Sequence, residues 1–256
     1  MRHYSIAFIA RAARYSPNSV GKDAAILEAV RQRLTEAGCQ CQEIVPEDRV
    51  TTVAYADAYV SMGRHQDTLN WLGEHERQWK PVINCTASVM ICNQRSLLMS
   101  VLEDDVPVPP RTGSDGYWVK RAYGCRQSDD DVQYAPDRET ADRLCEEMMA
   151  RGIAHIDVRA HVVGDWLKFY GVSGTDFFYC YLPESGKASV DEQQIRRLAA
   201  TAAELTSLDV YGGDCVIRPD GTLVLVDLND WPSFSPCRDE ASRAIAERIL
   251  QRLDNE

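Results

Sequence analysis

The sequence predicts an α/β protein whose N-terminal part forms a parallel sheet and whose second part is a mixed α/β region. In the first third of the chain, short apolar runs alternate with amphipathic segments of helical period. A proline-rich stretch at 106–110 then stops the helical pattern and favours an extended crossover. After it, strands follow one another more closely. We therefore expect two domains, 1–110 and 111–256.

The N-terminal elements follow from the spacing of apolar residues. We expect strands at 3–10, 40–45, 56–62 and 81–85, and helices at 23–37 and 66–79, with Gly38 ending the first helix. A third helix carries Leu97, Leu98, Val101 and Leu102. Parallel sheets bind their ligands beyond the carboxyl ends of the strands, so the loops 11–22 and 63–66 are candidate binding loops.

The second part contains more strands. We expect strands at 117–121, 153–163, 166–172 and 177–182, helices at 139–151 and 191–208, and a C-terminal helix through Ile245 and Ile249. A β-hairpin at 214–229 lies between the last two helices. Its turn, Arg218-Pro219-Asp220-Gly221, has Pro and Gly at the positions that a turn favours.

Charge and hydropathy exclude several classes of partner. The formal net charge of -11 repels nucleic acid and anionic membrane surfaces, so we expect neither as a partner. The first apolar run is too short to cross a membrane and lacks a small-residue cleavage pattern, so we expect a cytoplasmic protein. The sequence leaves open whether two copies of the chain form a homodimer.

The nine cysteines fit neither a disulfide framework nor a zinc site, because their spacings match neither pattern. Most of them fall in apolar segments and are expected in the core: Cys39, Cys85, Cys92, Cys145, Cys180 and Cys215. Cys125 and Cys237 fall in expected loops near the proposed site, where either thiol is a candidate reactive group.

The hairpin carries the strongest chemical signal. Asp214 and Asp227 flank buried strands at its open end, and Asn229 points to the same face as Asp227 because side chains alternate along a strand. Ionised carboxylates beside apolar strands need a cation or strong partners. Two carboxylates and an amide oxygen therefore indicate a Mg²⁺ site. The alternative is structural, with Asp214 capping a turn and Asp227 marking a strand end.

Four segments occur in an order that carries a family resemblance: 93–109, 117–121, 161–170 and 227–234. They begin with Asn93-Gln94-Arg95, contain Lys120 in Tyr117-Trp118-Val119-Lys120-Arg121, and end with the metal motif and a Pro-containing loop. This part of the chain resembles the ATP-grasp superfamily. The resemblance implies an ATP-grasp fold behind an N-terminal parallel α/β domain, with a central lid subdomain at about 111–160 and a metal-binding subdomain at about 161–256.

The resemblance also implies ATP as a co-substrate and assigns roles to residues. Catalytic and phosphate-binding roles fall on Arg95, Lys120 and Lys168, and the other expected ATP contacts are Ala160, His161, Val162 and Asp165. Two departures are evident. Arg159-Ala160 stands where many members have a Gln-Glu pair, and the loop 122–128 has a single glycine in place of a Gly-rich loop.

The acceptor is expected to be a small anionic metabolite held by the N-terminal loops and the Pro-containing loop. The candidate residues are Arg11, Arg14, Ser16, Asn18, Arg64 and Ser233. The resemblance implies a carboxylate-amine ligase that forms an acyl phosphate. A small-molecule kinase and a nucleotide-binding module without turnover remain as alternatives.

Overall fold

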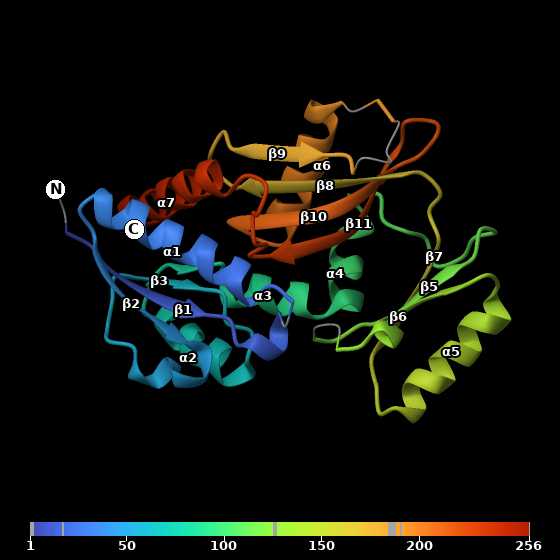
Figure 1. Ribbon diagram of the computed structural model, residues 1–256, viewed down its shortest axis with the longest axis horizontal. Helices are drawn as coiled ribbons and strands as arrows, with labels where there is room; N and C mark the ends of the chain where they lie inside the picture. Colours follow the sequence, from blue (N-terminus) through green and yellow to red (C-terminus); the bar gives the residue numbers. More distant parts are fainter. Residues whose placement is uncertain (1–2, 17, 125–126, 184–187, 190, 256) are drawn as a thin grey trace.

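The computed structural model describes residues 3–16, 18–124, 127–183, 188–189 and 191–255. Three sheets organise this part of the chain: a parallel sheet, a three-stranded antiparallel sheet and a four-stranded antiparallel sheet (Figure 1). We call the three-stranded sheet with its helix α5 the lid, and the four-stranded sheet the floor. The predicted α/β class is confirmed.

The parallel sheet has the strand order β2-β1-β3-β4. Its strands are β1 (Ser5–Ala10), β2 (Gln40–Pro46), β3 (Ala58–Ser61) and β4 (Val82–Ile83). Helices α1 (Val20–Glu36) and α2 (Gln66–Glu76) alternate with the strands, and short 3₁₀ turns η1 (Ala13–Tyr15) and η2 (Glu47–Thr52) follow β1 and β2. Gly38, at φ +91°, ends the α1 segment as predicted, because glycine adopts this left-handed backbone without a Cβ clash.

Two helices carry the chain from the parallel sheet toward the lid: α3 (Thr86–Asn93) and α4 (Arg95–Leu102). The lid sheet has the order β6-β5-β7 and contains β5 (Tyr117–Arg121), β6 (Val132–Ala135) and β7 (Ile156–Ala160). The turn η3 (Asp129–Asp131) precedes β6, and α5 (Arg138–Ala150) covers one face of the lid sheet (Figure 1). That face has its own small core of buried side chains: Val119, Ala135, Ala141 and Met148.

The floor sheet has the order β11-β10-β8-β9. Its strands are β8 (Asp165–Val172), β9 (Phe178–Tyr181), β10 (Val210–Ile217) and β11 (Leu223–Asp230), and the helices beside it are α6 (Glu192–Leu205) and α7 (Arg238–Asp254). Asp191 begins α6 by accepting hydrogen bonds from the Gln193 and Gln194 amides. The predicted β10–β11 hairpin is confirmed, and Gly221 adopts φ +84° in its turn.

The largest core joins segments from both ends of the chain. Helix α7 packs beside α1 (Figure 1), and Trp231 and Phe234, fully buried, lie in one cluster with Phe8 and Ile26. Asn84 strengthens this junction: its side chain donates to the Val210 carbonyl at 2.7 Å and accepts from two amides of the β10 segment. Parallel sheet and floor are therefore packed together, whereas the lid has a core of its own.

The sequence prediction missed two elements, α3 and β6. Helix α3 has only eight residues and a mixed apolar surface, so no clear helical face marks it. Strand β6 is an edge strand, and only Ala135 of its four residues is buried. Its sequence therefore lacks the alternation of apolar and polar residues that marks a half-buried strand. No helix in the described ranges is both long and apolar enough to span a membrane.

The expectation that Cys237 is a reactive loop thiol was wrong. Cys237 stands at the start of α7, only 4% exposed, and packs in the core shared by α1 and α7. Burial raises the pKa of its thiol to about 12, so little thiolate forms near neutral pH. Cys125 lies outside the described residues.

Candidate active site

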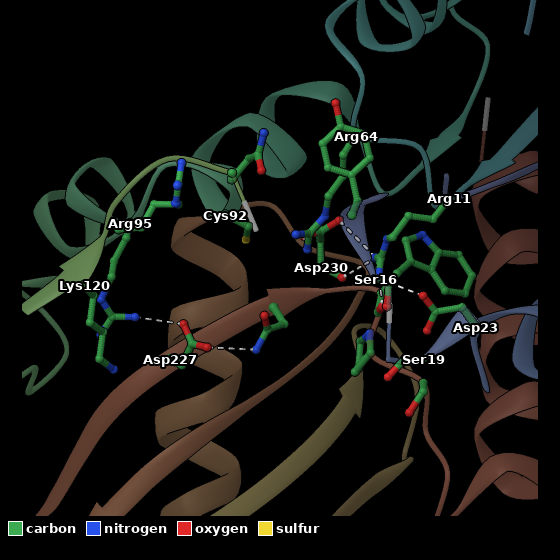
Figure 2. A pocket seen from close by; sticks show the side chains of 18 of the residues that line it. Arg11, Ser16, Ser19, Asp23, Arg64, Cys92, Arg95, Lys120, Asp227 and Asp230 are labelled. Atoms are coloured by element: carbon green, nitrogen blue, oxygen red, sulfur yellow. Dashed lines mark hydrogen bonds and ion pairs between the residues drawn. The ribbon is translucent and has the colours of Figure 1, made fainter. Parts of the chain in front are cut away.

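A cleft of about 460 Å³ opens where the parallel sheet, the lid and the floor meet. Its walls come from the loops after β1 and β3, the α3–α4 junction, the β5 end, and β11 with the loop that follows it. Figure 2 shows two groups of charged side chains in this cleft: Arg95, Lys120 and Asp227 on one side, and Arg11, Arg64 and Asp230 on the other. We call these the phosphate half and the acceptor half.

The three predicted metal ligands gather on one face of the hairpin. Asp214 and Asp227 pair directly across β10 and β11, and Asn229 Nδ2 donates to Asp227 Oδ2 at 3.2 Å. Asp227 and Asn229 line the cleft, and Asp214 lies beside them on the neighbouring strand. Carboxylate and amide oxygens are the ligands that Mg²⁺ prefers, and it takes waters and phosphates for the rest of its shell. This donor set fits such an ion.

A β-bulge in β11 shapes this face. Asp214 pairs with Asp227 but Cys215 pairs with Leu225, so Val226 is the extra residue of the pairing. Val226 lines an apolar slot next to the cleft, and Asp227 lines the cleft itself. The bulge therefore lets two consecutive side chains serve two adjoining parts of the site. Sequence alternation alone gives no sign of it.

Arg95 connects the lid to the floor. Its Nε donates to Asp157 Oδ2 of β7 at 3.1 Å, and its Nη1 donates to Asp227 Oδ1 at 3.1 Å. Its Nη2 donates to the Val226 carbonyl at 2.7 Å. The guanidinium thus lies on the same side of the cleft as Lys120, and it is held by two carboxylates that the sequence did not link to it. A phosphate group there has to compete with Asp227.

Lys168 and Asp214 form an ion pair on the open face of the floor, with Nζ and Oδ1 2.5 Å apart. Burial raises the pKa of Asp214 above its ordinary value, and the Lys168 ammonium opposes that shift only in part. A cation beside Asp214 favours its ionised form and can replace Lys168 as its partner. Lys168 lines neither the cleft nor the slot, so it reaches the site through Asp214.

Lys120 projects into the cleft from β5 (Figure 2). Its Nζ lies 5.9 Å from the Trp118 ring centroid and has no hydrogen-bond or ion-pair partner among the described residues. Burial, followed by the nearby Arg95 charge, lowers the pKa of Lys120 to about 8. A phosphate at this position would raise the pKa of Lys120 again and keep the ammonium charged at higher pH. This arrangement suits the predicted phosphate-binding role.

The predicted hinge lines a second, apolar slot between lid and floor. Its apolar walls include Trp118, Val162, Trp166, Val216 and Val226. The amides of Ala160 and His161 already donate, to the carbonyls of Pro110 and Gly116. Of the hinge amides, Val162 N–H has no acceptor in the described part of the chain. The slot suits a flat aromatic ring, but its free volume of about 20 Å³ holds about one water, so ring binding requires the walls to separate.

Asp165 does not reach either cavity. Side chains alternate along β8, so Trp166 and Lys168 share one face of the floor while Asp165 shares the other with Leu167 and Phe169. The Asp165 carboxylate accepts from the Ala188 amide at 2.7 Å and lines a hollow at the turn end of the hairpin. The expected ATP contact by Asp165 is therefore not part of the site.

The single-glycine loop after β5 is anchored by Asp131. This buried carboxylate accepts from Arg121 at 2.9 Å, from the Gln127 amide at 2.9 Å and from Arg151 at 2.6 Å. Burial alone raises the pKa of Asp131, but these hydrogen bonds outweigh it and lower the pKa to about 2. Gln127 and Ser128, at the end of this loop, are thus tied to the lid by hydrogen bonds to the Asp131 carboxylate.

Arg11, Arg64 and Asp230 form the acceptor half. Arg64 pairs with Asp230, and Arg11 Nη1 lies 3.2 Å from Asp23. Arg11 Nη2 also donates to the Trp231 carbonyl at 3.1 Å, and its Nε donates to the Met62 carbonyl at 3.2 Å. Burial lowers the pKa of Arg11, and the Arg64 charge lowers it further. Both guanidinium groups are therefore held by protein partners, Arg11 by Asp23 and two carbonyls and Arg64 by Asp230.

Glu47 positions the two N-terminal loops. This buried carboxylate accepts from the amides of Ala12, Arg64 and His65 at 2.5, 2.7 and 2.7 Å. Such bonds fix the loops that follow β1 and β3, because a carboxylate accepts several amide hydrogens strongly. Glu47 lies in η2, far along the chain from both loops, and nothing in the sequence points to it.

The other predicted acceptor residues divide into two groups. Ser16 and Ser233 line the cleft, and Ser233 Oγ lies 2.9 Å from Ser235 Oγ. Arg14 and Asn18 are exposed and do not line it; Arg14 lies over the Tyr15 ring, 5.0 Å from its centroid. The loop turns through η1, so only some of its side chains face inward.

Several lining residues were not predicted. The clearest are Ser19, Asp23, Cys92, Asn93 and Asp230. Asp230 directly follows the predicted Asp-Leu-Asn motif, so its place at the strand end was a usable signal. Asn93 and Cys92 end α3, a helix that the sequence did not reveal. Burial raises the pKa of Cys92 well above its ordinary value, so this thiol is not a nucleophile here.

Comparison with known proteins connects this site to a fold. No protein-family model and no curated protein matches the sequence. A D-alanine-D-alanine ligase from Coxiella burnetii matches in structure with a TM-score of 0.72 and 13% identity, over 98% of this chain and 95% of that chain. A RimK domain ATP-grasp protein from Sphaerobacter thermophilus matches with a TM-score of 0.70 and 16% identity, over 96% and 99%. The D-cycloserine synthetase DcsG matches with a TM-score of 0.67 and 17% identity, over 97% and 99%. These likenesses run through all three sheets, and they confirm the sequence prediction: this chain has the ATP-grasp fold.

Proposed function

We propose that this protein is an ATP- and Mg²⁺-dependent ligase that activates a small-molecule carboxylate as an acyl phosphate, which an amine then attacks. One observation carries the proposal: the phosphate half and the acceptor half face each other across one cleft (Figure 2). The first half offers cations and metal-type oxygens. The second offers a guanidinium beside buried acceptor atoms. The two groups are close enough to hold two substrates in a shared space.

In the phosphate half, positioning and charge supply the chemistry. Mg²⁺ held by Asp227, Asn229 and Asp214 supplies charge neutralisation for the transferring phosphoryl group. Lys120 and Arg95 hold the phosphate oxygens and stabilise the negative charge that develops on them. The γ-phosphoryl group passes to a substrate carboxylate oxygen, and ADP leaves. No protein nucleophile is needed for this step.

The acceptor half supports an amine as the second reactant. Arg64 suits the anionic end of a substrate, since a guanidinium binds carboxylates through two parallel donors. Two buried acceptor atoms belong to lining residues: Asn93 Oδ1 has no hydrogen bond to the described residues, and Asp230 Oδ2 has none but forms an ion pair with Arg11 Nη2 at 3.8 Å. Buried acceptors of this kind are stabilised by a donor on the ligand, such as an amine. The amine attacks the acyl carbon and phosphate leaves.

The deciding experiment is a screen of carboxylates and amines, singly and in pairs, for release of ADP and phosphate in the presence of ATP and Mg²⁺. A ligase releases both only when a carboxylate and an amine are supplied together. A kinase releases ADP without free phosphate and needs a single acceptor. Absence of ADP from every mixture, with ATP still raising the melting temperature, leaves a binding module and overturns the proposal.

A pair of variants tests the metal assignment. Asp227→Ala removes a carboxylate from the cleft and should abolish Mg²⁺-dependent turnover. Asp220→Ala removes the same group from the exposed turn at the other end of the hairpin and should leave turnover unchanged. Full activity in Asp227→Ala contradicts the metal site.

A further inference from the structure

A second hollow, of about 410 Å³, lies on the opposite face of the floor from the cleft. Its walls come from the start of β10, the β8–β9 turn, and the helices α6 and α7 (Figure 1); we call it the rear hollow. Side chains alternate along β10, so Tyr211 faces this hollow, whereas Gly212 faces the side that carries its β11 partner Asn229. None of the described residues lines both cavities. A volume of this size holds a small organic molecule.

The rear hollow is rich in guanidinium groups. Arg196 of α6 and both Arg248 and Arg252 of α7 line it. The buried Asp209 carboxylate accepts from Arg248 Nε at 2.7 Å and from Arg252 Nη1 at 2.8 Å, so two cations share one negative charge. Glu204 bears the other carboxylate among the described lining residues, and it is exposed to water. The side chains of the hollow therefore carry a net positive charge, although the formal net charge of the chain is -11.

Two of these guanidinium groups keep donors that the protein does not use. Arg248 directs Nε and Nη2 at Asp209, and its Nη1 has no hydrogen-bond or ion-pair partner among the described residues. This nitrogen lies against Gly174, where a Cβ would be 2.6 Å from it. Arg196 donates from Nη2 to the Asp176 carbonyl, and its Nε and Nη1 have no partner in the described part of the chain. An anion in the hollow can accept from both groups.

The Tyr211 hydroxyl adds a buried donor on the same side. Gly171 lies between Tyr211 and Phe178 in the strand pairing, and a Cβ on Gly171 would be 2.5 Å from the hydroxyl oxygen. The phenol therefore reaches across β8 toward Phe178, and Arg196 Cζ lies 6.0 Å from the Phe178 ring centroid. Burial raises the pKa of Tyr211 to about 12, and the Arg196 charge opposes that shift. The residue is 4% exposed, and its protonated hydroxyl has no hydrogen bond to the described residues.

We propose that the rear hollow binds a small organic anion, whose carboxylate or phosphate group accepts from the donors of Tyr211, Arg196 and Arg248. The apolar part of the ligand packs against Phe177 and Leu208, which also line the hollow. Guanidinium and hydroxyl donors bind carboxylates and phosphates alike, so the shared feature is the anionic group. This site goes beyond the proposed ligase reaction, because it lies on the other side of the floor.

The test is a calorimetric titration with three probes: benzoate, phenyl phosphate and benzamide. Benzamide has the shape of benzoate without its charge. At least one of the two anions should bind saturably and at least tenfold more tightly than benzamide, and the tighter anion shows whether the hollow prefers a carboxylate or a phosphate. Absence of saturable binding by both anions, or equal binding of benzamide, overturns the inference.

Three variants locate the bound anion. Tyr211→Phe keeps the ring and removes only the hydroxyl, so it should weaken anion binding roughly tenfold, the expected effect of losing a hydrogen bond to a charged acceptor. Arg196→Met should weaken it at least as much. Arg197→Met is the matched control, because Arg197 is the exposed neighbour of Arg196 on α6 and does not line the hollow. Its replacement should leave anion affinity unchanged.

Arg64→Met separates this site from the cleft, whose acceptor half also suits a carboxylate. Anion binding that persists in Arg64→Met and weakens in Arg196→Met supports the rear hollow. The reverse pattern assigns the anion to the cleft, and it overturns the inference while the proposed function stands. Affinities equal to that of the unaltered protein in both Tyr211→Phe and Arg196→Met overturn it as well.

Discussion

Lys120 should make nucleotide affinity fall as the pH rises through about 8. Burial and the Arg95 charge lower the pKa of this lysine to about 8, from an ordinary value of 10.5. The folded protein without ligand therefore loses the Lys120 proton as the pH rises through about 8. A bound phosphate favours the charged form, so binding takes up this proton at higher pH.

The size of the effect follows from that pKa. If only the protonated form binds phosphate, then affinity should fall roughly 25-fold between about pH 7.5 and 9.5, because the protonated fraction falls by that factor around a pKa of about 8. The nucleotide phosphates are already ionised throughout this range and contribute little. The same lowered pKa has a consequence for folding: the cost of charging Lys120 is present below about pH 8 and disappears as the pH rises toward 10.5.

The assay is a calorimetric titration of ATP with Mg²⁺ at several pH values, with two variants beside the unaltered protein. Lys120→Arg keeps its charge over the whole range, so its affinity should change little with pH. Lys120→Met should bind weakly at every pH. Equal pH profiles for the unaltered protein and Lys120→Arg refute the reasoning, since they place the titrating group elsewhere.

Three other substitutions have expected outcomes. Arg95→Met leaves the buried Asp157 with one guanidinium partner and should lower the free energy of unfolding by about 3 kcal/mol in urea denaturation; a change below half that value contradicts a bridging role. Asp131→Asn should lower the free energy of unfolding by about 1–2 kcal/mol at neutral pH after solvent screening. This difference from the original protein should disappear as the pH falls from about 3.8 to about 2, because a carboxyl group with a lowered pKa stabilises the fold only above that range. Glu47→Gln directs an amide N–H₂ at one of three backbone donors, so we expect the free energy of unfolding to fall by about 2 kcal/mol and acceptor binding to weaken. A stability equal to that of the original protein would show that the loops keep their conformation without Glu47.

Much of the architecture could be predicted because the sequence patterns that determine it are local. The helical period of α1, the stop at Gly38 and the turn at Gly221 each depend on a few neighbouring residues, and all three appear as predicted. The same holds for Asp227 and Asn229, which a strand brings to one face by alternation alone. Features that depend on local sequence patterns can therefore be predicted from the sequence.

The unpredicted features depend on contacts between distant segments. Glu47 acts on loops that follow other strands, and Arg95 pairs with carboxylates more than 60 positions along the chain. The bulge at Val226 shifts a register that alternation assumes to be regular. The ATP contact expected of Asp165 came from the family resemblance, whereas its carboxylate accepts from the Ala188 amide at the turn end of the hairpin. None of these features has a signature in the amino-acid sequence, because each one depends on contacts that form when the three sheets pack together.

The separate core of the lid determines which half of the reaction machinery can travel. Since parallel sheet and floor share one interior, Asp227 and Asn229 of the floor stay fixed with respect to Arg64 of the parallel sheet. Lys120 and the hinge wall of the slot belong to the lid. Arg95 forms ion pairs with Asp157 of the lid and Asp227 of the floor and so connects them. Trp118 of the slot and Lys120 of the cleft lie on the same strand, β5, so any displacement of the lid that widens the slot also moves Lys120 relative to Asp227.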